Sequence, residues 1–361
     1  MPPVQNEEAA LLGKEKMDDI ELRSVQLQLT SVRPFGETKS EVRVRTDTCD
    51  LLVVAQGDHT KPCIITYHDI GLNWSHFEPF FNHREMKGLM KNFFVLHVNA
   101  PGQEDGAPNL PDDCVYSMDD LSNQINYVLC HFAIKSFIGF GVGAGANVLA
   151  RFALANPQKV DALALVNCSS TQAGWIEWAC QKMNSRILRS RGMTQGVVDY
   201  LMWHHFGRTP ERISEISDEY RAHFCSGLNA HNLGYLVESY ARRTDLGIER
   251  EGTTLRMPVL NVTAAHSPHI NDTVTLNGRL NPTKSTWLKV SDCALVLEEE
   301  PRKVAEAFRL FLQGEGYVPP VTPTEGAWWD RGGAGAGKRR VCRTSPVIRI
   351  TENPISEAVA C

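Results

Sequence analysis

The chain has 361 residues, of which 42% are hydrophobic and 22% are charged, and its formal net charge is −5. This length suits one large domain or two medium ones, and the apolar content can supply a full core. The acidic balance gives no basis for nucleic-acid binding. No run approaches the roughly 20 apolar residues of a membrane span, and the acidic stretch 1–19 resembles neither a secretory signal nor a transit peptide.

Ten cysteines are scattered along the chain. None forms a C-x-x-C pair or stands beside a histidine at zinc spacing, so we expect no metal site among them. Several cysteines lie within apolar runs, among them Cys63, Cys130 and Cys168. We therefore expect reduced thiols that are buried as small hydrophobic side chains.

From the N-terminus, residues 1–20 are acidic and lack a sustained period, which predicts disorder. Short alternating segments then predict antiparallel strands, and apolar runs predict buried ones. The expected strands are residues 25–29, 42–44, 51–55, 63–67, 93–98, 160–166, 258–263 and 286–290, with one more starting at Phe137.

Helical segments alternate with these strands, which indicates a parallel sheet with right-handed crossovers. Ser117 is the expected N-cap of a helix that runs to Cys130, and Pro301 is expected in the first turn of the last helix. The expected helices are residues 77–81, 86–90, 117–130, 301–312 and one that ends at Asn156 and Pro157.

The alternation stops between residues 171 and 254, where apolar residues keep helical spacing. We interpret this segment as a helical cap over the carboxyl edge of the sheet. Within it, Trp175 and Trp178 share one helical face, which favours packing in the core or cap over a partner surface. His204 and His205 are neighbours and should not face one way on a helix, so we expect no metal site there.

Residues 137–147 (FIGFGVGAGAN) predict a buried strand, a glycine-dense turn and a helix. In the α/β-hydrolase fold a G-x-S-x-G nucleophile elbow occupies such a turn. Gly141 and Gly145 supply the frame, but the serine position is Gly143, which has no side chain to attack a substrate. The glycines fit neither a dinucleotide fingerprint nor a P-loop.

The other two positions of a hydrolase triad also lack the catalytic side chains, an acid and a histidine. The acid should follow the strand after the cap, where the chain has Ser267, and the histidine should precede the E-x-P landmark by five residues, where it has Ala294. We therefore predict a mostly parallel central sheet flanked by helices, with the cap inserted after the sixth strand, and degenerate triad positions at Gly143, Ser267 and Ala294.

The loop after strand 63–67 would supply the first oxyanion donor. Here it contains His68, Asp69 and Ile70, and a carboxylate at Asp69 would oppose a developing oxyanion. His68 and Asp69 either brace the loop by hydrogen bonds or contact a ligand. The residues expected to line a residual cleft are His68, Asp69, Ile70, Gly141, Gly143 and Ala144.

Beyond residue 317 the composition shifts to Pro, Gly and basic residues, and 331–349 carries six basic residues and no acid. We predict a domain at 21–317 followed by a disordered basic tail at 318–361. Thr344 and Ser345 lie among arginines and are candidate phosphorylation sites. The tail is either solvated or bound to an anionic membrane surface.

Four strings resemble the N-myc downstream-regulated gene (NDRG) family, and the resemblance covers about residues 20–318. They are residues 66–73 (TYHDIGLN), 99–107 (NAPGQEDGA), 141–146 (GVGAGA) and 311–317 (FLQGEGY). The resemblance implies an α/β-hydrolase fold without hydrolase activity. It also implies a cytoplasmic phosphoprotein with roles in differentiation, stress response, signalling and membrane trafficking. The tail lacks the family's Ser/Thr-dense repeats.

Three hypotheses follow for function. The leading one is a catalytically inactive signalling or adaptor protein that binds other proteins, with no metal, no nucleic acid and no cofactor. The second is a hydrolase with a relocated nucleophile, either a cysteine or Ser267. The third is a small-molecule or lipid sensor that uses the residual cleft. We expect a cytoplasmic location, either free or peripherally associated with a membrane.

Overall fold

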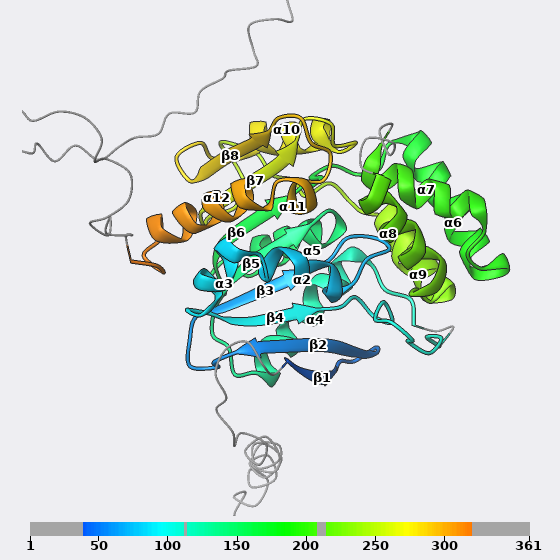
Figure 1. The fold of residues 1–361 in the computed structure, drawn as a ribbon, viewed down its shortest axis with the longest axis horizontal. Coiled ribbons are helices and arrows are strands. Elements are labelled where there is room, and N and C mark those ends of the chain that lie inside the picture. The colour runs from blue at the N-terminus through cyan, green and yellow to red at the C-terminus, as the bar shows by residue number, and fades with distance from the viewer. Residues whose placement is uncertain (1–38, 112–113, 208–213, 320–361) are drawn as a thin grey trace, which may run out of the picture. The chain divides into compact units, whose positions relative to one another are not determined.

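An eight-stranded sheet forms the centre of the structure, a computed structural model that describes residues 39–111, 114–207 and 214–319 (Figure 1). The strand order is β1-β2-β4-β3-β5-β6-β7-β8. The β1–β2 and β2–β4 pairs are antiparallel, and all other pairs are parallel. The strands are β1 Lys39–Arg45, β2 Asp50–Gly57, β3 Cys63–Tyr67, β4 Phe94–Val98, β5 Phe137–Val142, β6 Val160–Val166, β7 Val259–Ala264 and β8 Ser285–Val290.

Burial across the sheet follows the predicted pattern. Every residue of β3 and β4 is buried, as expected of strands covered on both faces, whereas at the two edges β1 is mostly exposed and β8 is partly exposed. The mostly parallel sheet confirms the predicted fold class. The predicted strand at 25–29 lies outside the described residues, as do the tail beyond residue 319 and the candidate sites Thr344 and Ser345.

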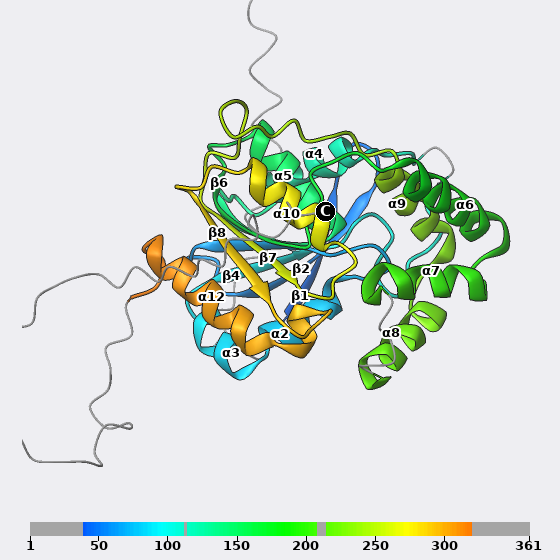
Figure 2. The same ribbon diagram turned by 90° about the horizontal axis from the view of Figure 1, so that it is seen from above.

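Helices cover both faces of the sheet (Figure 2). Side chains of successive strand residues alternate between two hydrophobic clusters, so that Ile65 packs with one layer of helices and Ile64 with the other. The first layer holds α4 Met118–His131, α5 Ala144–Ala155 and α10 Ile270–Arg279. The second holds η1 Trp74–Phe77, α2 Glu78–Phe81, α3 Arg84–Met90, α11 Val296–Glu299 and α12 Pro301–Gly314.

Two predicted helix starts are confirmed. Ser117 and Asp120 form a capping box at α4, each side chain accepting the other's backbone N–H, and Pro301 occupies the first turn of α12. Helix α10 was not predicted. Its sequence is mostly polar, and only Thr273 and Leu276 are buried, so few apolar side chains mark it as a helix.

The cap lies between β6 and β7, as predicted, and consists of α6 Trp175–Arg191, α7 Gln195–Phe206, α8 Ser214–Ser226 and α9 Ala230–Ala241 (Figure 1). The last cap helix ends at Ala241, and residues 242–254, the rest of the predicted cap segment, contain no helix. Cap residues such as Leu201 and Tyr240 belong to the same hydrophobic cluster as the sheet. The cap is therefore packed onto the domain core.

Two predictions about individual side chains are also wrong. Trp175 is 87% exposed rather than packed in the core or cap. Cys130 is exposed at the end of α4, although Cys63, Cys114, Cys168 and Cys293 are buried as expected. Within the described ranges, no helix is long and apolar enough to cross a membrane.

Arg243 anchors the chain segment that directly follows α9, the last helix of the cap. Its Nε donates to the Thr171 carbonyl at 3.0 Å, its Nη2 contacts Glu177 at 2.8 Å, and its guanidinium lies 4.1 Å from the Tyr240 ring centre. We expect Arg243→Ala to lower the free energy of unfolding by about 2–3 kcal/mol, because a buried guanidinium is removed and both the Thr171 carbonyl and the partly exposed Glu177 carboxylate lose their donor. Urea unfolding measures this loss.

The adjacent Arg242 is the matched control. Its side chain is 59% exposed and pairs with Glu238 on the same helix turn, so Arg242→Ala should change stability by about 0.5 kcal/mol or less. Equal losses for the two variants would contradict the anchoring role of Arg243.

Candidate functional site

The glycine turn between β5 and α5 has the geometry of a nucleophile elbow. Gly143 has a φ of +53°, and its neighbours in the frame are needed for close packing. A Cβ on Gly141 would lie 2.6 Å from the Ala146 backbone, and one on Gly145 would lie 2.2 Å from the Tyr67 carbonyl oxygen. The glycines let the helix approach the sheet closely.

Asp69 fills the space that a nucleophile side chain would need. A Cβ built on Gly143 would lie 2.1 Å from Asp69 Cγ and 2.2 Å from both carboxylate oxygens. The Asp69 side chain is only about 3% exposed and comes from the loop directly after β3. The carboxylate thus stands at the point of the elbow where a hydrolase would present its serine.

The same carboxylate accepts the hydrogen bonds of both oxyanion-hole donors. In this fold, one donor is the N–H of the residue after the nucleophile and the other comes from the loop after the third strand. Here Ala144 N–H and Ile70 N–H both donate to Asp69 Oδ1, each at 2.8 Å. An oxyanion would have to displace a negative charge that the protein itself supplies.

His68 braces the loop, in agreement with one of the two predicted roles. The Ala100 N–H donates to His68 Nε2 at 2.9 Å, so the ring proton is on Nδ1, which donates to the Asp69 carbonyl at 2.8 Å. Burial lowers the pKa of His68 to about 4 and keeps the ring neutral. The ring also ties two of the motif strings, residues 66–73 and 99–107, to each other.

Ser267 and Ala294 lie at the carboxyl ends of β7 and β8, on the same edge of the sheet as Gly143. Ser267 Oγ donates to Asn167 Oδ1 at 3.1 Å and accepts the His269 N–H at 3.1 Å. The Ala294 N–H donates to Glu299 Oε1 at 2.6 Å. Both hydrogen bonds of the Ser267 hydroxyl therefore go to amide groups rather than to an imidazole base.

His204 and His205 both reach Asp69 from α7, contrary to the expectation that they face different ways. His204 Nε2 lies 3.1 Å and His205 Nδ1 3.9 Å from Asp69 Oδ2. Both rings are buried. Burial would raise the pKa of Asp69, but His204, with His205 and His269, holds that pKa well below its usual range.

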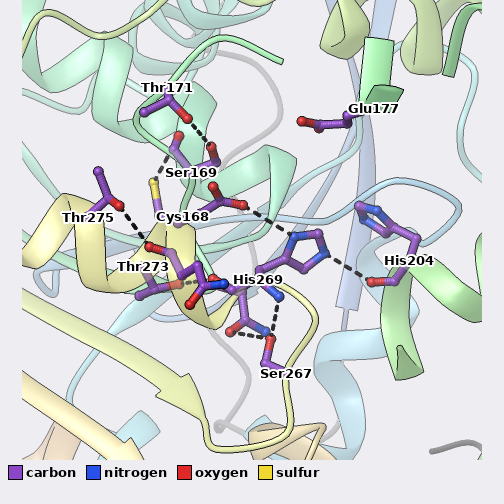
Figure 3. A network of polar contacts seen from close by, with 12 residues as sticks. Cys168, Ser169, Thr171, Glu177, His204, Ser267, His269, Thr273 and Thr275 are labelled. Carbon is purple, nitrogen blue, oxygen red and sulfur yellow. Dashed lines mark hydrogen bonds and ion pairs between the residues drawn. The ribbon is translucent and has the colours of Figure 1, made fainter. Parts of the chain in front are cut away.

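His269 extends this network from the loop after β7 (Figure 3). Its Nε2 donates to the His204 carbonyl at 3.0 Å, while Nδ1 lies 3.9 Å from Asp272 Oδ2. Burial alone would lower the pKa of His269, but the nearby carboxylates of Asp272 and Asp69 raise it. Sequence reasoning did not single out His269.

A small cavity of about 40 Å³ lies beside these groups. Of the predicted cleft residues, His68 and Asp69 line it, whereas Ile70, Gly141, Gly143 and Ala144 do not. The remaining lining includes residues that the sequence did not mark. Among them are His76, Tyr220, His269, Leu297 and Glu298, and the lining also includes His204 and His205 of the cap. The histidines in separate loops and helices were the signal in the sequence that could have indicated this cavity. That they converge on one site, however, depends on how the cap packs onto the sheet domain.

The sheet order, the elbow and the inserted cap define an α/β-hydrolase fold. The structure is similar to a thermophilic esterase from Thermogutta terrifontis, with a TM-score of 0.64, 15% identity and coverage of 77% of this chain and 99% of that chain. It is also similar to the enol-lactonase from Burkholderia xenovorans, with a TM-score of 0.62, 17% identity and coverage of 75% and 100%. At these identities the likeness concerns the fold alone.

Within that fold, the chain belongs to the Ndr family, whose model matches residues 41–319. Protein NDRG3 of Xenopus laevis is 37% identical over 328 residues, which are 86% of each chain. Protein NDRG1 of Xenopus tropicalis is 39% identical over 273 residues, 73% of this chain and 67% of that one. The resemblance found in the sequence is thereby confirmed.

Proposed function

We propose that this chain is a non-catalytic member of the Ndr family that acts by binding other proteins in signalling or trafficking. The observation that carries the proposal is Asp69, whose carboxylate fills the nucleophile space at Gly143 and takes both oxyanion donors. Acyl transfer needs each of these elements free. The glycine at 143, with Ser267 and Ala294 at the other triad positions, leaves no chain of nucleophile, base and acid.

A relocated nucleophile finds little support in the geometry. Burial raises the pKa of Cys168 to about 12, which leaves a negligible thiolate fraction at neutral pH. Ser267 donates its proton to an amide oxygen rather than to a base. We expect purified protein to hydrolyse short p-nitrophenyl esters no faster than its Asp69→Ala variant. Turnover that depends on Asp69 or His68 would overturn the proposal.

A sensor for metabolites is the weaker alternative. Ligand pockets usually measure about 300–1,000 Å³, and the cavity beside Asp69 has about 40 Å³. Thermal-shift screening against lipids and metabolites tests this alternative. Stabilisation by a ligand of that size, lost when the cavity wall is altered at Leu297, would favour it over an adaptor.

The binding role has a surface available on α6. Trp175 and Ile176 are 87% and 82% exposed, and Met183 further along the helix is 56% exposed. Exposed aromatic and aliphatic side chains of this kind are typical of interaction sites. The basic tail beyond residue 319 is a second proposed contact, with partner proteins or an anionic membrane surface, at about 1 kcal/mol for each basic residue near the lipid.

Proximity labelling in cells tests both the proposed location and the partners. We expect the full chain to label a set of cytoplasmic signalling or trafficking proteins connected with differentiation or stress responses. A chain without residues 320–361 should lose the part of this set that the tail selects. A Trp175→Ser variant should lose the part that α6 selects. Unchanged labelling in both variants would contradict these two contact surfaces.

A further inference from the structure

We propose that Asp69, His204 and His205 form a binding site for a divalent transition-metal ion, with Zn²⁺ as the ion that they fit best. Two imidazoles and a carboxylate are ligands that this ion prefers. The site goes beyond the proposed function, because partner binding neither requires nor excludes a metal.

The donor atoms have the spacing that a metal ion requires. Asp69, His204 and His205 each offer one ligand atom, and these three atoms all lie within 4.8 Å of one another. Metal–ligand bonds of about 2.0–2.2 Å in tetrahedral geometry separate the ligand atoms by roughly 3.3 Å. The observed separations from Asp69 Oδ2, 3.1 Å to His204 and 3.9 Å to His205, bracket that value.

The tautomer of His205 leaves a lone pair facing a negative charge. His205 Nε2 lies 2.9 Å from the Ile70 carbonyl oxygen, which can only accept, so Nε2 carries the proton. A neutral imidazole carries a single ring proton. Nδ1 then has no proton, and its lone pair points at the Asp69 carboxylate. A cation between the two atoms removes this repulsion.

In Asp69 and His205, the polar atom that would not bind the metal already forms the hydrogen bonds that are typical of metal sites. A metal-bound histidine usually donates its other ring N–H to a carbonyl or carboxylate, which fixes the ring orientation. His205 does so through Ile70. The second oxygen of Asp69 is fixed by two backbone N–H groups, from Ile70 and Ala144. The carboxylate and the His205 ring are thus preorganised to bind through the atoms that face each other.

The cavity offers room for a further ligand. Asp69, His204 and His205 all line the 40 Å³ space, and a water molecule needs only about 10–15 Å³. Three protein ligands and an open fourth position occupied by water are typical of non-structural zinc sites. One carboxylate and two neutral imidazoles leave a Zn²⁺ site with a net charge of +1. The open position would therefore accept an anionic or water ligand.

An ion pair between protonated His204 and Asp69 is the competing explanation. It accounts for the 3.1 Å contact but provides no hydrogen for His205 Nδ1. The two explanations differ in the effect of Asp69→Asn. An asparagine keeps an oxygen for Ile70 and Ala144 and can donate its amide hydrogen to His205, so the fold is retained while the anionic ligand is lost.

The experiment is a titration of the full-length, chelator-treated protein with Co²⁺ and Zn²⁺ chloride after alkylation of accessible thiols, among them Cys130, Cys180 and Cys225. We expect one Co²⁺ per chain with the visible d–d absorption of a tetrahedral site, displaced by Zn²⁺. The affinity should fall by about 100-fold or more in Asp69→Asn and His205→Gln, since even outer-shell changes weaken metal sites by about 10–100-fold.

His223→Gln is the matched control. It removes one histidine of a neighbouring pair, His76 and His223, whose ring centres lie 4.3 Å apart outside the proposed ligand set. It should leave stoichiometry and affinity unchanged. The proposal is overturned if the wild-type protein binds neither ion at one equivalent, or if tetrahedral Co²⁺ binding persists in Asp69→Asn. Because that variant retains the hydrogen bonds of the loop, the result does not depend on His205→Gln folding.

Discussion

Gly143→Ser should yield a protein about 2–5 kcal/mol less stable than the wild type and without esterase turnover. The new Cβ would lie 2.1 Å from Asp69 Cγ, and Asp69 cannot move away without giving up the Ile70 and Ala144 N–H groups. Overpacking of a closed site costs about 1–3 kcal/mol, and the left-handed backbone adds about 1–2 kcal/mol for a residue with a Cβ. Urea unfolding and a p-nitrophenyl ester assay measure the two results.

Two companion variants separate the clash from the backbone strain. Gly247 has a φ of +63° and nothing within 4 Å of a built Cβ, so Gly247→Ser reports the backbone contribution alone. Asp69→Ala combined with Gly143→Ser should recover at least about 1 kcal/mol relative to the sum of the single changes. Wild-type stability together with efficient turnover in Gly143→Ser would show that the triad positions assigned to Ser267 and Ala294 are wrong.

Acid should destabilise the fold well above the range in which carboxylates titrate. His68, His97 and His205 are buried, and burial lowers their pKa values to about 4, 3 and 3. The folded state therefore excludes protons that the unfolded chain binds below about pH 6.5. The stabilisation is complete above that pH and is lost as the pH falls towards the folded pKa values. Each ring contributes about 2 kcal/mol between pH 7 and pH 5.

His269 offsets part of this loss, since its pKa is raised and its contribution grows on acidification. We therefore expect a net loss of about 3–5 kcal/mol between pH 7 and pH 5, a large share of a typical stability of about 5–15 kcal/mol. Urea unfolding at a series of pH values measures how the free energy of unfolding changes with pH. Chelator is present so that no metal ion binds at Asp69, His204 and His205.

His97→Gln isolates one of the three rings. His97 Nδ1 lies 2.8 Å from Thr66 Oγ1, and an amide side chain can still pair with that hydroxyl. Near pH 5, the free energy of unfolding should change with pH less steeply in this variant than in the wild type. The difference should be about 1.4 kcal/mol per pH unit, which corresponds to one proton fewer taken up on unfolding. His131→Gln, at an exposed position, is the matched control. A wild-type stability that stays constant from pH 7 to pH 5.5 would contradict neutral, buried histidines.

Much of the fold was predictable because its strands are short apolar runs with clear breakers. Residues 63–67 and 160–166 match β3 and β6, and the glycines at 141, 143 and 145 identify the elbow without any side chain to mark it. Helix α10 escaped prediction because it rests on the core through little more than Leu276. Local patterns detect elements that bury a periodic apolar face and miss those that do not.

The candidate site was predictable only in part, for a different reason. Asp69 was expected near the oxyanion loop, but its position over Gly143 follows from how the β3 loop meets α5 across the sheet. The convergence of His204 and His205 on one oxygen requires the last turn of α7 to pack against that loop. Helical spacing alone argued against it, since adjacent residues on a helix point about 100° apart.

The Asp69 carboxylate also constrains the order in which catalysis could return to this chain. The carboxylate competes with any substrate for the two backbone donors, and it has the advantage of being part of the same chain. Well-placed intramolecular groups reach effective concentrations of about 10⁵ M or more, far above the concentration of any diffusing ester. A serine arriving first at position 143 meets a clash and a filled site. Substitution of Asp69 must therefore come before the nucleophile, and by itself it offers no catalytic gain.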